Sequence, residues 1–262
     1  MRAGMGDFLD ILARDAARTI AEGYYEVTGE GATSIRSLSE AIDGCNLNAV
    51  ITEIKTASPS MGEIRTGIDA VEVATVMESS GATGISVLTE PKHFNGDLQA
   101  LHRIRGTVGI PVLMKDIVLD PGQLDSASRM GADAVLLIQA LFDRGHCRCT
   151  LDEMIGEAHR LGLEVLLETH ERDEFLAALS TGADLVGVNN RDLRTLDVDL
   201  RVTGKILEEY DPSERTVVAE SGIKSPEDLR LLRDCGARAF LIGSAIMSSD
   251  DIGETVRGFV RA

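Results

Sequence analysis

The chain has 262 residues, a formal net charge of −17 and 44% hydrophobic residues, which suits one large α/β domain with a sizeable core. The acid excess argues against nucleic-acid binding, where basic patches supply the affinity. No apolar run approaches the roughly 20 residues that span a bilayer. The N-terminal residues show no apolar stretch typical of a secretory signal. We therefore expect a cytoplasmic protein, a monomer or weak homo-oligomer, with neither a nucleic-acid nor a membrane partner.

Lysine is scarce in this chain. Of its 26 basic residues only five are Lys, and two of these, Lys55 and Lys115, follow apolar runs. An acidic chain with few lysines resembles proteins from salt-loving organisms, because high ionic strength screens the repulsion between acids. We predict that molar salt stabilises the fold. A denaturation midpoint that is the same in low and molar salt would contradict this prediction.

The cysteines are too few to form a disulfide scaffold in a domain of this size. They are Cys45, Cys147, Cys149 and Cys235. The segment 146–149, His-Cys-Arg-Cys, has some metal-ligand character, but it lacks paired ligands at the usual zinc spacing. We expect an exposed loop there and no metal site.

Residues 1–48 precede the first strand-like run. Apolar residues between Phe8 and Ala21 recur at helical spacing and predict an amphipathic helix. A second short helix is expected over Ser37–Ile42. We expect this N-terminal extension to cover one end of the core.

From Ala49 onward, short apolar runs alternate with amphipathic helical stretches. The predicted strands are Ala49–Lys55, Gly84–Leu88, Pro111–Lys115, Ala134–Ile138, Glu164–Glu168, Leu185–Asn189, Val217–Glu220 and Ala239–Ile242. The predicted helices are Ala70–Ser80, Leu98–Arg105, Gly122–Met130, Leu151–Leu161, Glu171–Leu179, Arg201–Glu209 and Pro226–Asp234. Four helices run into a Gly-Ala pair, and we expect Gly81, Gly131, Gly182 and Gly236 to form left-handed caps.

Strands that are apolar on both faces and alternate with helices are typical of a parallel sheet covered by helices. Eight such units favour a closed barrel. An open nucleotide-binding sheet would carry G-x-G-x-x-G after a strand, and the sequence has none. The sequence therefore predicts an α/β protein, a (β/α)8 TIM barrel. It forms a single domain over 1–262, with 1–48 as N-terminal helical extension.

Polar residues gather where the predicted strands end, which is where a (β/α)8 barrel has its active site. The amino ends of the strands carry nothing comparable. The residues at the carboxyl ends are Glu53, Lys55, Thr89, Glu90, Lys115, Asp116, Gln139, Glu168, His170, Asn189, Arg191, Glu220, Ser221, Gly243 and Ser244.

Glu53 and Lys55 end the first strand and, being two apart, point to the same side. Opposite charges at the end of a core strand are costly to bury unless they pair or bind a ligand. Ser58 and the loop up to Gly62 suit a close approach to that ligand. The alternative interpretation is a surface ion pair beside a turn.

The turns after the last two strands indicate a phosphate site. Ser221-Gly222 follows the seventh strand, and Gly243-Ser244 follows the eighth and opens a helix. Glycine lets the backbone approach a phosphate, and N–H groups at a helix start point towards it. Phosphate binding after strands seven and eight recurs in this fold. The alternative is two ordinary glycine-containing turns.

Three further strand ends carry candidate groups. Glu168 ends a wholly apolar strand, and desolvation there would raise its pKa and suit it to proton transfer. Lys115 ends a similar strand and is a candidate for the same reason. The alternative, given equal weight, is a lysine that forms a salt bridge at the rim of the barrel. Asn189 and Arg191 are two apart and can point to the same side of the chain, and the planar guanidinium of Arg191 matches a carboxylate. The alternative is that Asn189 is a capping residue and that Arg191 forms a surface ion pair with Asp192. The five histidines are not spaced as metal ligands are, and we expect each of them to lie at the surface.

Together these segments resemble the indole-3-glycerol phosphate synthase family over nearly the whole chain, including the N-terminal helical extension. The shared motifs are Glu53-Ile54-Lys55, Ser58-Pro59-Ser60, the run from Leu88 to Gly96, Leu113-Met114-Lys115-Asp116, Glu168, Asn189-Asn190-Arg191-Asp192-Leu193, Glu220-Ser221-Gly222 and Ile242-Gly243-Ser244. One departure is Ile117, where many relatives carry Phe.

The resemblance implies conversion of 1-(2-carboxyphenylamino)-1-deoxyribulose 5-phosphate to indole-3-glycerol phosphate in tryptophan biosynthesis, with loss of carbon dioxide and water. No metal or organic cofactor is implied. The implied catalytic residues are Glu53, Lys55, Lys115, Glu168, Asn189 and Ser221. Those implied for substrate binding are Ser58, Phe94 and Arg191 in the pocket, and Gly222, Gly243 and Ser244 at the phosphate.

Three alternative functions stay open at this point. Phosphoribosylanthranilate isomerase shares the barrel, but it uses a Cys at the first strand end, where this chain has Glu53 and Lys55. A Schiff-base aldolase would use Lys55 or Lys115 as nucleophile. A non-catalytic phosphate-binding subunit would bind ligand without turnover.

Overall fold

Eight parallel strands close into a barrel in this computed structural model, which describes residues 7–29, 35–55, 57–58, 62–63, 69–210 and 215–262. For 57, 58, 62 and 63 only the backbone is described. The barrel strands are β1 (Ala49–Ile54), β4 (Gly84–Leu88), β5 (Val112–Lys115), β6 (Ala134–Ile138), β7 (Glu164–Thr169), β8 (Leu185–Asn189), β9 (Thr216–Glu220) and β10 (Ala239–Ile242). Their order is β1-β10-β9-β8-β7-β6-β5-β4, so the predicted (β/α)8 barrel is confirmed.

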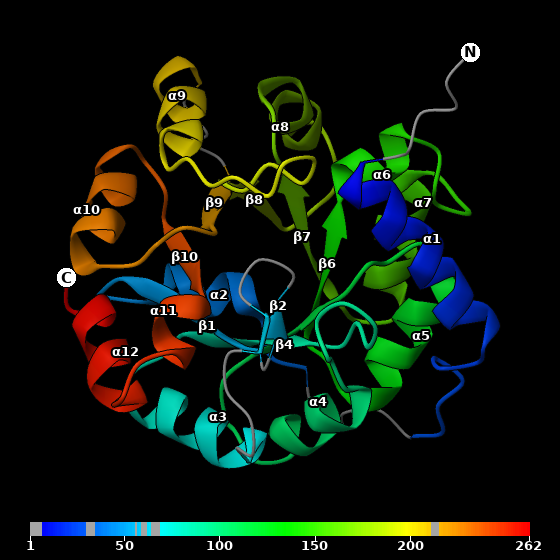
Figure 1. Ribbon diagram of the computed structural model, residues 1–262, viewed down its shortest axis with the longest axis horizontal. Helices are drawn as coiled ribbons and strands as arrows, with labels where there is room; N and C mark the ends of the chain where they lie inside the picture. The colour runs from blue at the N-terminus through cyan, green and yellow to red at the C-terminus, as the bar shows by residue number, and fades with distance from the viewer. Residues whose placement is uncertain (1–6, 30–34, 56, 59–61, 64–68, 211–214) are drawn as a thin grey trace.

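Helices surround the barrel on all sides (Figure 1). They are α1 (Phe8–Ala21), α2 (Leu38–Asp43), α3 (Ala70–Ser79), α4 (Leu98–Arg105), α5 (Pro121–Met130), α6 (Gln139–Asp143), α7 (Leu151–Arg160), α8 (Arg172–Leu179), α9 (Arg201–Glu209), α10 (Pro226–Asp234), α11 (Ser244–Met247) and α12 (Ile252–Val260). A short antiparallel pair, β2 (Ala57–Ser58) with β3 (Gly62–Glu63), follows β1. Within the described residues, no helix is long and apolar enough to cross a membrane.

The eight predicted strands and the seven predicted helices between them agree with the structure to within one residue at each end. Neither α6 nor α12 was predicted from the sequence; for α6 the reason is that β6 passes directly into this helix at Gln139 with no turn residue between them. Three of the four expected glycine caps are left-handed, with φ of 100° at Gly81, 87° at Gly131 and 111° at Gly236. Gly182 does not adopt this conformation; the turn after α8 is closed by Thr181 Oγ1, which donates to the Ala178 carbonyl.

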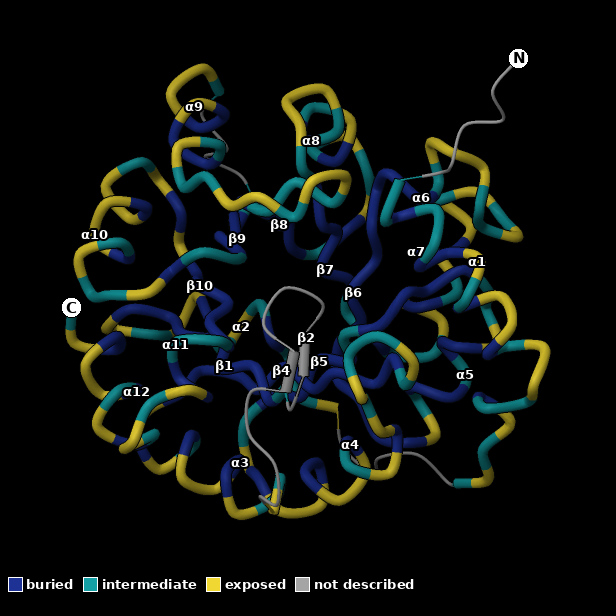
Figure 2. Tube along the Cα trace, in the orientation of Figure 1, coloured by how far each residue is buried: buried dark blue, intermediate teal, exposed yellow. Residues whose placement is uncertain are grey.

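Two apolar clusters hold the fold together. One fills the barrel interior, with Ile51, Leu113, Leu136 and Leu166 among its members. The other lies between the strands and the ring of helices. Every residue of β1 is buried, as expected for parallel strands covered on both faces, and exposed residues are concentrated on the outer faces of the helices (Figure 2).

The N-terminal extension packs at both ends of the barrel, whereas the sequence predicted cover at one end. Helix α2 packs beneath the amino ends, where Glu164 at the start of β7 accepts hydrogen bonds from Ser37 and Ser39. Helix α1 lies over the β5–β6 side, and Phe8 and Leu12 reach the cavity at the carboxyl ends. The extension therefore contributes to the site as well as to the core.

The prediction that the amino ends carry no comparable polar groups is wrong. Asp133, which precedes β6, is fully buried, and its carboxylate lies 2.9 Å from Arg105 Nε. It also accepts the backbone N–H groups of Arg36 and Val112. These contacts tie the extension, α4 and the start of β5 together, so they are structural.

Candidate active site

A cavity of about 360 Å³ opens at the carboxyl ends of the strands. The sequence-predicted site residues that line it are Glu53, Lys55, Phe94, Lys115, Glu168, Asn189, Arg191, Ser221, Gly222, Gly243 and Ser244. Ser58 lies in β2, and its side chain is outside the described part of the chain, as are Pro59 and Ser60. The residues that the motifs singled out therefore converge on one space.

Glu53 and Lys55 form an ion pair on β1. Lys55 Nζ lies 2.8 Å from Glu53 Oε1, and the Glu53 side chain is 4% exposed. Burial raises the pKa of Glu53, but the charges of Lys55 and Lys115 outweigh it, so this pKa lies below its usual range. A Cβ at Gly243 would come within 2.4 Å of Glu53 Oε1, so only glycine leaves room for the carboxylate here. Glu53 is therefore a buried carboxylate that is ionised at neutral pH.

Lys115 reaches across the barrel mouth to two carboxylates. Its Nζ donates to Glu168 Oε2 at 3.0 Å and to Glu220 Oε2 at 2.9 Å. Burial lowers the pKa of Lys115, but Glu168, Glu220 and Glu53 outweigh it and raise this pKa above its ordinary value. Lys115 is therefore an ammonium ion fixed within hydrogen-bond reach of the cavity.

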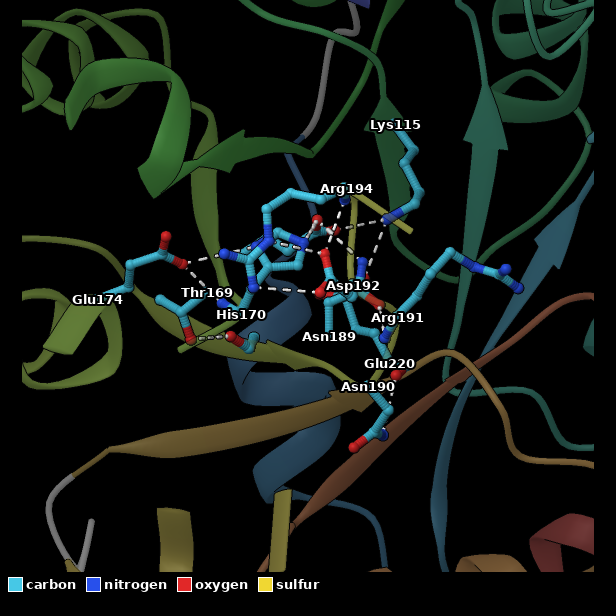
Figure 3. A network of polar contacts seen from close by, with 12 residues as sticks. Lys115, Thr169, His170, Glu174, Asn189, Asn190, Arg191, Asp192, Arg194 and Glu220 are labelled. Carbon is cyan, nitrogen blue, oxygen red and sulfur yellow. Dashed lines mark hydrogen bonds and ion pairs between the residues drawn. The ribbon is translucent and has the colours of Figure 1, made fainter. Parts of the chain in front are cut away.

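The two carboxylates on Lys115 have different surroundings (Figure 3). Glu168 Oε1 also accepts from Asn189 Nδ2 at 3.0 Å and lies 3.1 Å from His170 Nε2. Among the described residues, Glu220 Oε1 has no hydrogen-bond partner. Burial acts to raise the pKa of both. For Glu168 the opposing effect of Lys115 and His170 prevails and lowers the pKa, while the pKa of Glu220 stays raised at about 7.

Asn189 and Arg191 are held by the turn after β8. Asn189 Oδ1 accepts the Arg191 backbone N–H at 3.0 Å, which orients the amide so that Nδ2 faces Glu168. Arg191 Nη1 donates to the Leu196 carbonyl at 2.8 Å. The guanidinium is thus fixed by the chain itself at the cavity wall.

The turns after β9 and β10 face the same cavity. Ser221 has φ of 63° and Gly222 has φ of 85°, so two consecutive residues adopt the left-handed conformation that L side chains disfavour. A Cβ at Gly222 would come within 2.4 Å of Val198 Cγ1. Gly243 is the N-cap of α11, and Ser244 is its first residue. Backbone N–H groups thus gather on this side of the cavity.

Glu90 and Asp116 line the cavity, but their carboxylates are engaged elsewhere. Glu90 accepts the backbone N–H groups of Lys92, His93 and Phe94, which shapes the loop that carries Phe94. Asp116 accepts the Tyr25 hydroxyl at 2.9 Å, and burial raises the pKa of Asp116 to about 6. These two acids support the site rather than face a ligand.

The expectation of five surface histidines is correct for His102 and His159, which are exposed. It is wrong for His170, whose side chain is 10% exposed and pairs with Glu168. His93 and His146 are half-buried and pair with Asp15 and Asp10 of α1. The sequence carried a signal for His170, because it stands two residues after Glu168 and so points to the same side.

Glu220 is another site residue that had no assigned role in the sequence analysis. It ends the apolar run 217–219 just as Glu168 ends 165–167, so the same criterion would have found it. Apolar side chains also line the cavity, among them Phe8, Leu193, Leu196 and Val198. Ile117, the one departure from the family pattern, is buried at the cavity wall.

The segment 146–149 is half-buried except for Arg148, so the expected exposed loop is only partly correct. All four cysteines are free thiols. Among the described residues, no group of three or more His, Cys, Asp or Glu side chains is arranged to hold a metal ion.

Fold and site together define a (β/α)8-barrel enzyme with acid–base groups at the carboxyl ends of its strands. A family model described as Indole-3-glycerol phosphate synthase matches residues 11–259. The chain belongs to the indole-3-glycerol phosphate synthase family.

Curated relatives support this membership. An indole-3-glycerol phosphate synthase from Koribacter versatilis is 46% identical over 212 residues, covering 81% of this chain and 80% of its own. The one from Aromatoleum aromaticum is 42% identical and covers 95% of this chain and 93% of its own. The one from Methanopyrus kandleri is 45% identical and covers 87% of this chain and 88% of its own.

Solved structures of low sequence identity to this chain show the fold alone. One is thiamine phosphate pyrophosphorylase from Pyrococcus furiosus, with a TM-score of 0.60, 19% sequence identity, and coverage of 85% of this chain and 96% of that one.

Proposed function

We propose that this chain converts 1-(2-carboxyphenylamino)-1-deoxyribulose 5-phosphate to indole-3-glycerol phosphate, with loss of carbon dioxide and water, in tryptophan biosynthesis. The observation that carries this function is that Lys55, Lys115, Glu53, Glu168 and Glu220 surround one cavity, in a chain whose family model spans residues 11–259. Ring closure, decarboxylation and dehydration need proton transfer and charge stabilisation but no redox step, and these groups supply both.

Lys115 is the proposed general acid of ring closure. As the arene carbon attacks the ketone carbon, the carbonyl oxygen gains an electron pair and must take a proton. An alkoxide is a stronger base than an amine, so an ammonium can protonate it even when its pKa is raised. The carboxylates of Glu168 and Glu220 hold the ammonium in place, and its charge also stabilises the developing oxyanion.

Attack on the ketone leaves a positive charge on the ring system until carbon dioxide departs. Glu53 and Glu168 both have lowered pKa values and so offer negative charge at neutral pH. Loss of water then requires an acid at the departing hydroxyl and a base for the leaving ring proton. We assign the acid to Lys55 and the base to Glu53 or Glu168, with Asn189 and Ser221 orienting the substrate.

The substrate would lie with its phosphate against Gly222, Gly243 and Ser244. These residues offer backbone N–H groups rather than cationic side chains, which suits an acidic chain. The aromatic ring would lie towards the apolar side of the cavity, near Phe94 and Ile117.

We predict that Arg191→Ala raises KM by about ten- to a hundredfold with little change in kcat. The guanidinium is proposed to bind the substrate carboxylate, and a hydrogen bond to a charged group contributes about 1.5–3 kcal/mol. Steady-state kinetics of the variant measure the effect. Arg201→Ala, whose side chain is exposed on α9, is the control. An unchanged KM in Arg191→Ala would remove Arg191 from the carboxylate site.

Product mass tests the proposed function against its alternatives. The expected product has the mass of the substrate less one carbon dioxide and one water. A product of unchanged mass would indicate an isomerase instead. Covalent trapping of a keto-phosphate on the protein by borohydride would indicate a Schiff-base aldolase. The ion pairs of Lys55 and Lys115 disfavour this function, because Schiff-base formation needs the neutral amine.

We also propose that the enzyme works in the cytoplasm as a monomer or weak homo-oligomer. Its four free thiols are typical of a reducing compartment. Gel filtration across a range of protein concentrations tests the oligomeric state.

A further inference from the structure

We propose that His170 and Glu174 are positioning residues of this reaction, which keep Glu168 oriented and ionised. They thereby give Glu168 and Glu220, the two acids that share Lys115, different roles. Glu168 remains the anion, whereas Glu220 is the carboxyl group that carries a proton near neutral pH. This inference rests on the proposed function, and it adds two residues to the set that the motifs identified.

A chain of contacts runs from α8 to the cavity (Figure 3). Glu174 Oε2 accepts the backbone N–H of His170 at 2.7 Å and lies 3.6 Å from His170 Nδ1. His170 Nε2 lies 3.1 Å from Glu168 Oε1, and Glu168 Oε2 accepts from Lys115 Nζ at 3.0 Å. Carboxylate, imidazole, carboxylate and ammonium therefore alternate along one line.

The imidazole of His170 is flanked by carboxylate oxygens at both nitrogens. An ionised carboxylate only accepts hydrogen bonds, and a neutral imidazole would present a lone pair to one of the two. The doubly protonated ring avoids this repulsion and pairs with both acids. Burial lowers the pKa of His170, but Glu168 and Glu174 outweigh it and raise this pKa to about 9. The ring is therefore an imidazolium at neutral pH.

Glu168 thus has two hydrogen-bond donors, Asn189 and Lys115, and an ion-pair contact with His170. Glu220 has Lys115 at one oxygen and, among the described residues, no hydrogen-bond partner at the other. Donors to an ionised carboxylate favour the charged form, and burial without donors favours the neutral form. The difference in partners therefore places the negative charge on Glu168.

Other charged groups near His170 are already engaged. Lys115 on β5 is separated from the ring by Glu168. Arg194, on the loop after β8, pairs with Asp192 and with Glu171, the residue next to His170. Asp143 on α6, which packs against β7 and α8, accepts from Gln139 Nε2. Glu168 and Glu174 are therefore the groups that set the charge of the ring.

The first test is the pH profile of kcat for His170→Asn. Without the imidazolium the pKa of Glu168 rises, so the pH below which Glu168 is protonated and activity is lost moves up. We expect the acid limb of the profile to shift upward by about one pH unit or more and kcat at pH 7 to fall by about tenfold or more, with little change in KM. A loss of activity with both limbs unmoved would mean a merely structural role and overturn the proposal.

The second test is Glu174→Gln, which removes a charge but nearly conserves the side-chain shape. Here the pKa of His170 falls, so the ring loses its proton at a lower pH. We expect the alkaline limb to move down by about one pH unit or more, whereas His170→Asn moves the acid limb. His159→Asn is the matched control, because His159 pairs with Asp184 at 2.9 Å on the exposed face of α7, and both limbs should stay in place.

Titration of the His170 ring by NMR separates this proposal from the proposed function, because it needs no turnover. We expect the ring to titrate near pH 9 in the wild-type protein and lower in Glu174→Gln. Titration below pH 7 in the wild type would overturn the proposal even if the enzyme makes indole-3-glycerol phosphate. A wild-type protein that makes none would instead overturn the proposed function, and with it the catalytic role of His170.

Discussion

Replacing Lys115 with alanine is expected to lower kcat by about 10²–10⁴-fold, the range that a general acid contributes. The variant loses the proton donor at the ketone oxygen and the charge that stabilises the oxyanion. It also leaves Glu168 and Glu220 buried beside each other without their shared ammonium, so the pKa values of both rise and Glu168 no longer offers a permanent negative charge. The effect should therefore appear in kcat more than in KM.

Two controls make this result interpretable. Lys205→Ala removes one of the few other lysines at an exposed position on α9 and should leave kcat unchanged. Product binding by Lys115→Ala, together with its circular dichroism, should show that the fold and the phosphate site persist. Wild-type kcat in the folded Lys115→Ala protein would refute the assignment of Lys115 as the acid.

The largest expected effect on stability lies at the opposite end of the barrel. Asp133→Ala removes the carboxylate that pairs with Arg105, whose side chain is 8% exposed, at 2.9 Å. Removing one partner of a buried ion pair leaves an uncompensated charge and costs about 3–5 kcal/mol. The backbone N–H groups of Arg36 and Val112 also lose their acceptor. We therefore expect a loss of about 3–5 kcal/mol in the free energy of unfolding.

Urea denaturation measures this loss, and kinetics at low temperature separate it from catalysis. The folded Asp133→Ala enzyme should keep its kcat, because Asp133 lies at the amino ends and does not line the cavity. Asp234→Ala is the control, since Asp234 and its partner Arg233 are exposed, and exposed pairs contribute little. Equal stability of the two variants would contradict the structural role of Asp133.

The sequence predicted the barrel, and the gathering of the candidate residues at one end of it, because both depend on local patterns. Apolar runs such as Ala134–Ile138 specify strands by themselves, and the fold places whatever ends each strand at one mouth. Glu53, Lys115, Glu168 and Asn189 could therefore be assigned to one site from their positions alone.

Contacts across the barrel could not be predicted in this way. The pairing of Lys115 with Glu220 joins β5 to β9, and nothing in the sequence near either residue indicates its partner. His170 was misassigned to the surface because its burial depends on α8, which supplies Glu174. Asp133 was missed because its partners Arg36 and Arg105 come from the extension and from α4. The electrostatics of the site thus follow from the tertiary structure.

The most direct test of the proposed function uses the absence of tryptophan from this chain. Incubation of the protein with 1-(2-carboxyphenylamino)-1-deoxyribulose 5-phosphate, in low and in molar salt, should produce a rising indole fluorescence. The protein itself contributes no indole signal, and Lys115→Ala controls for contaminating enzyme. A rise with the wild type and none with the variant is the predicted result. A flat trace in both salts from a folded wild-type protein would contradict the proposed function.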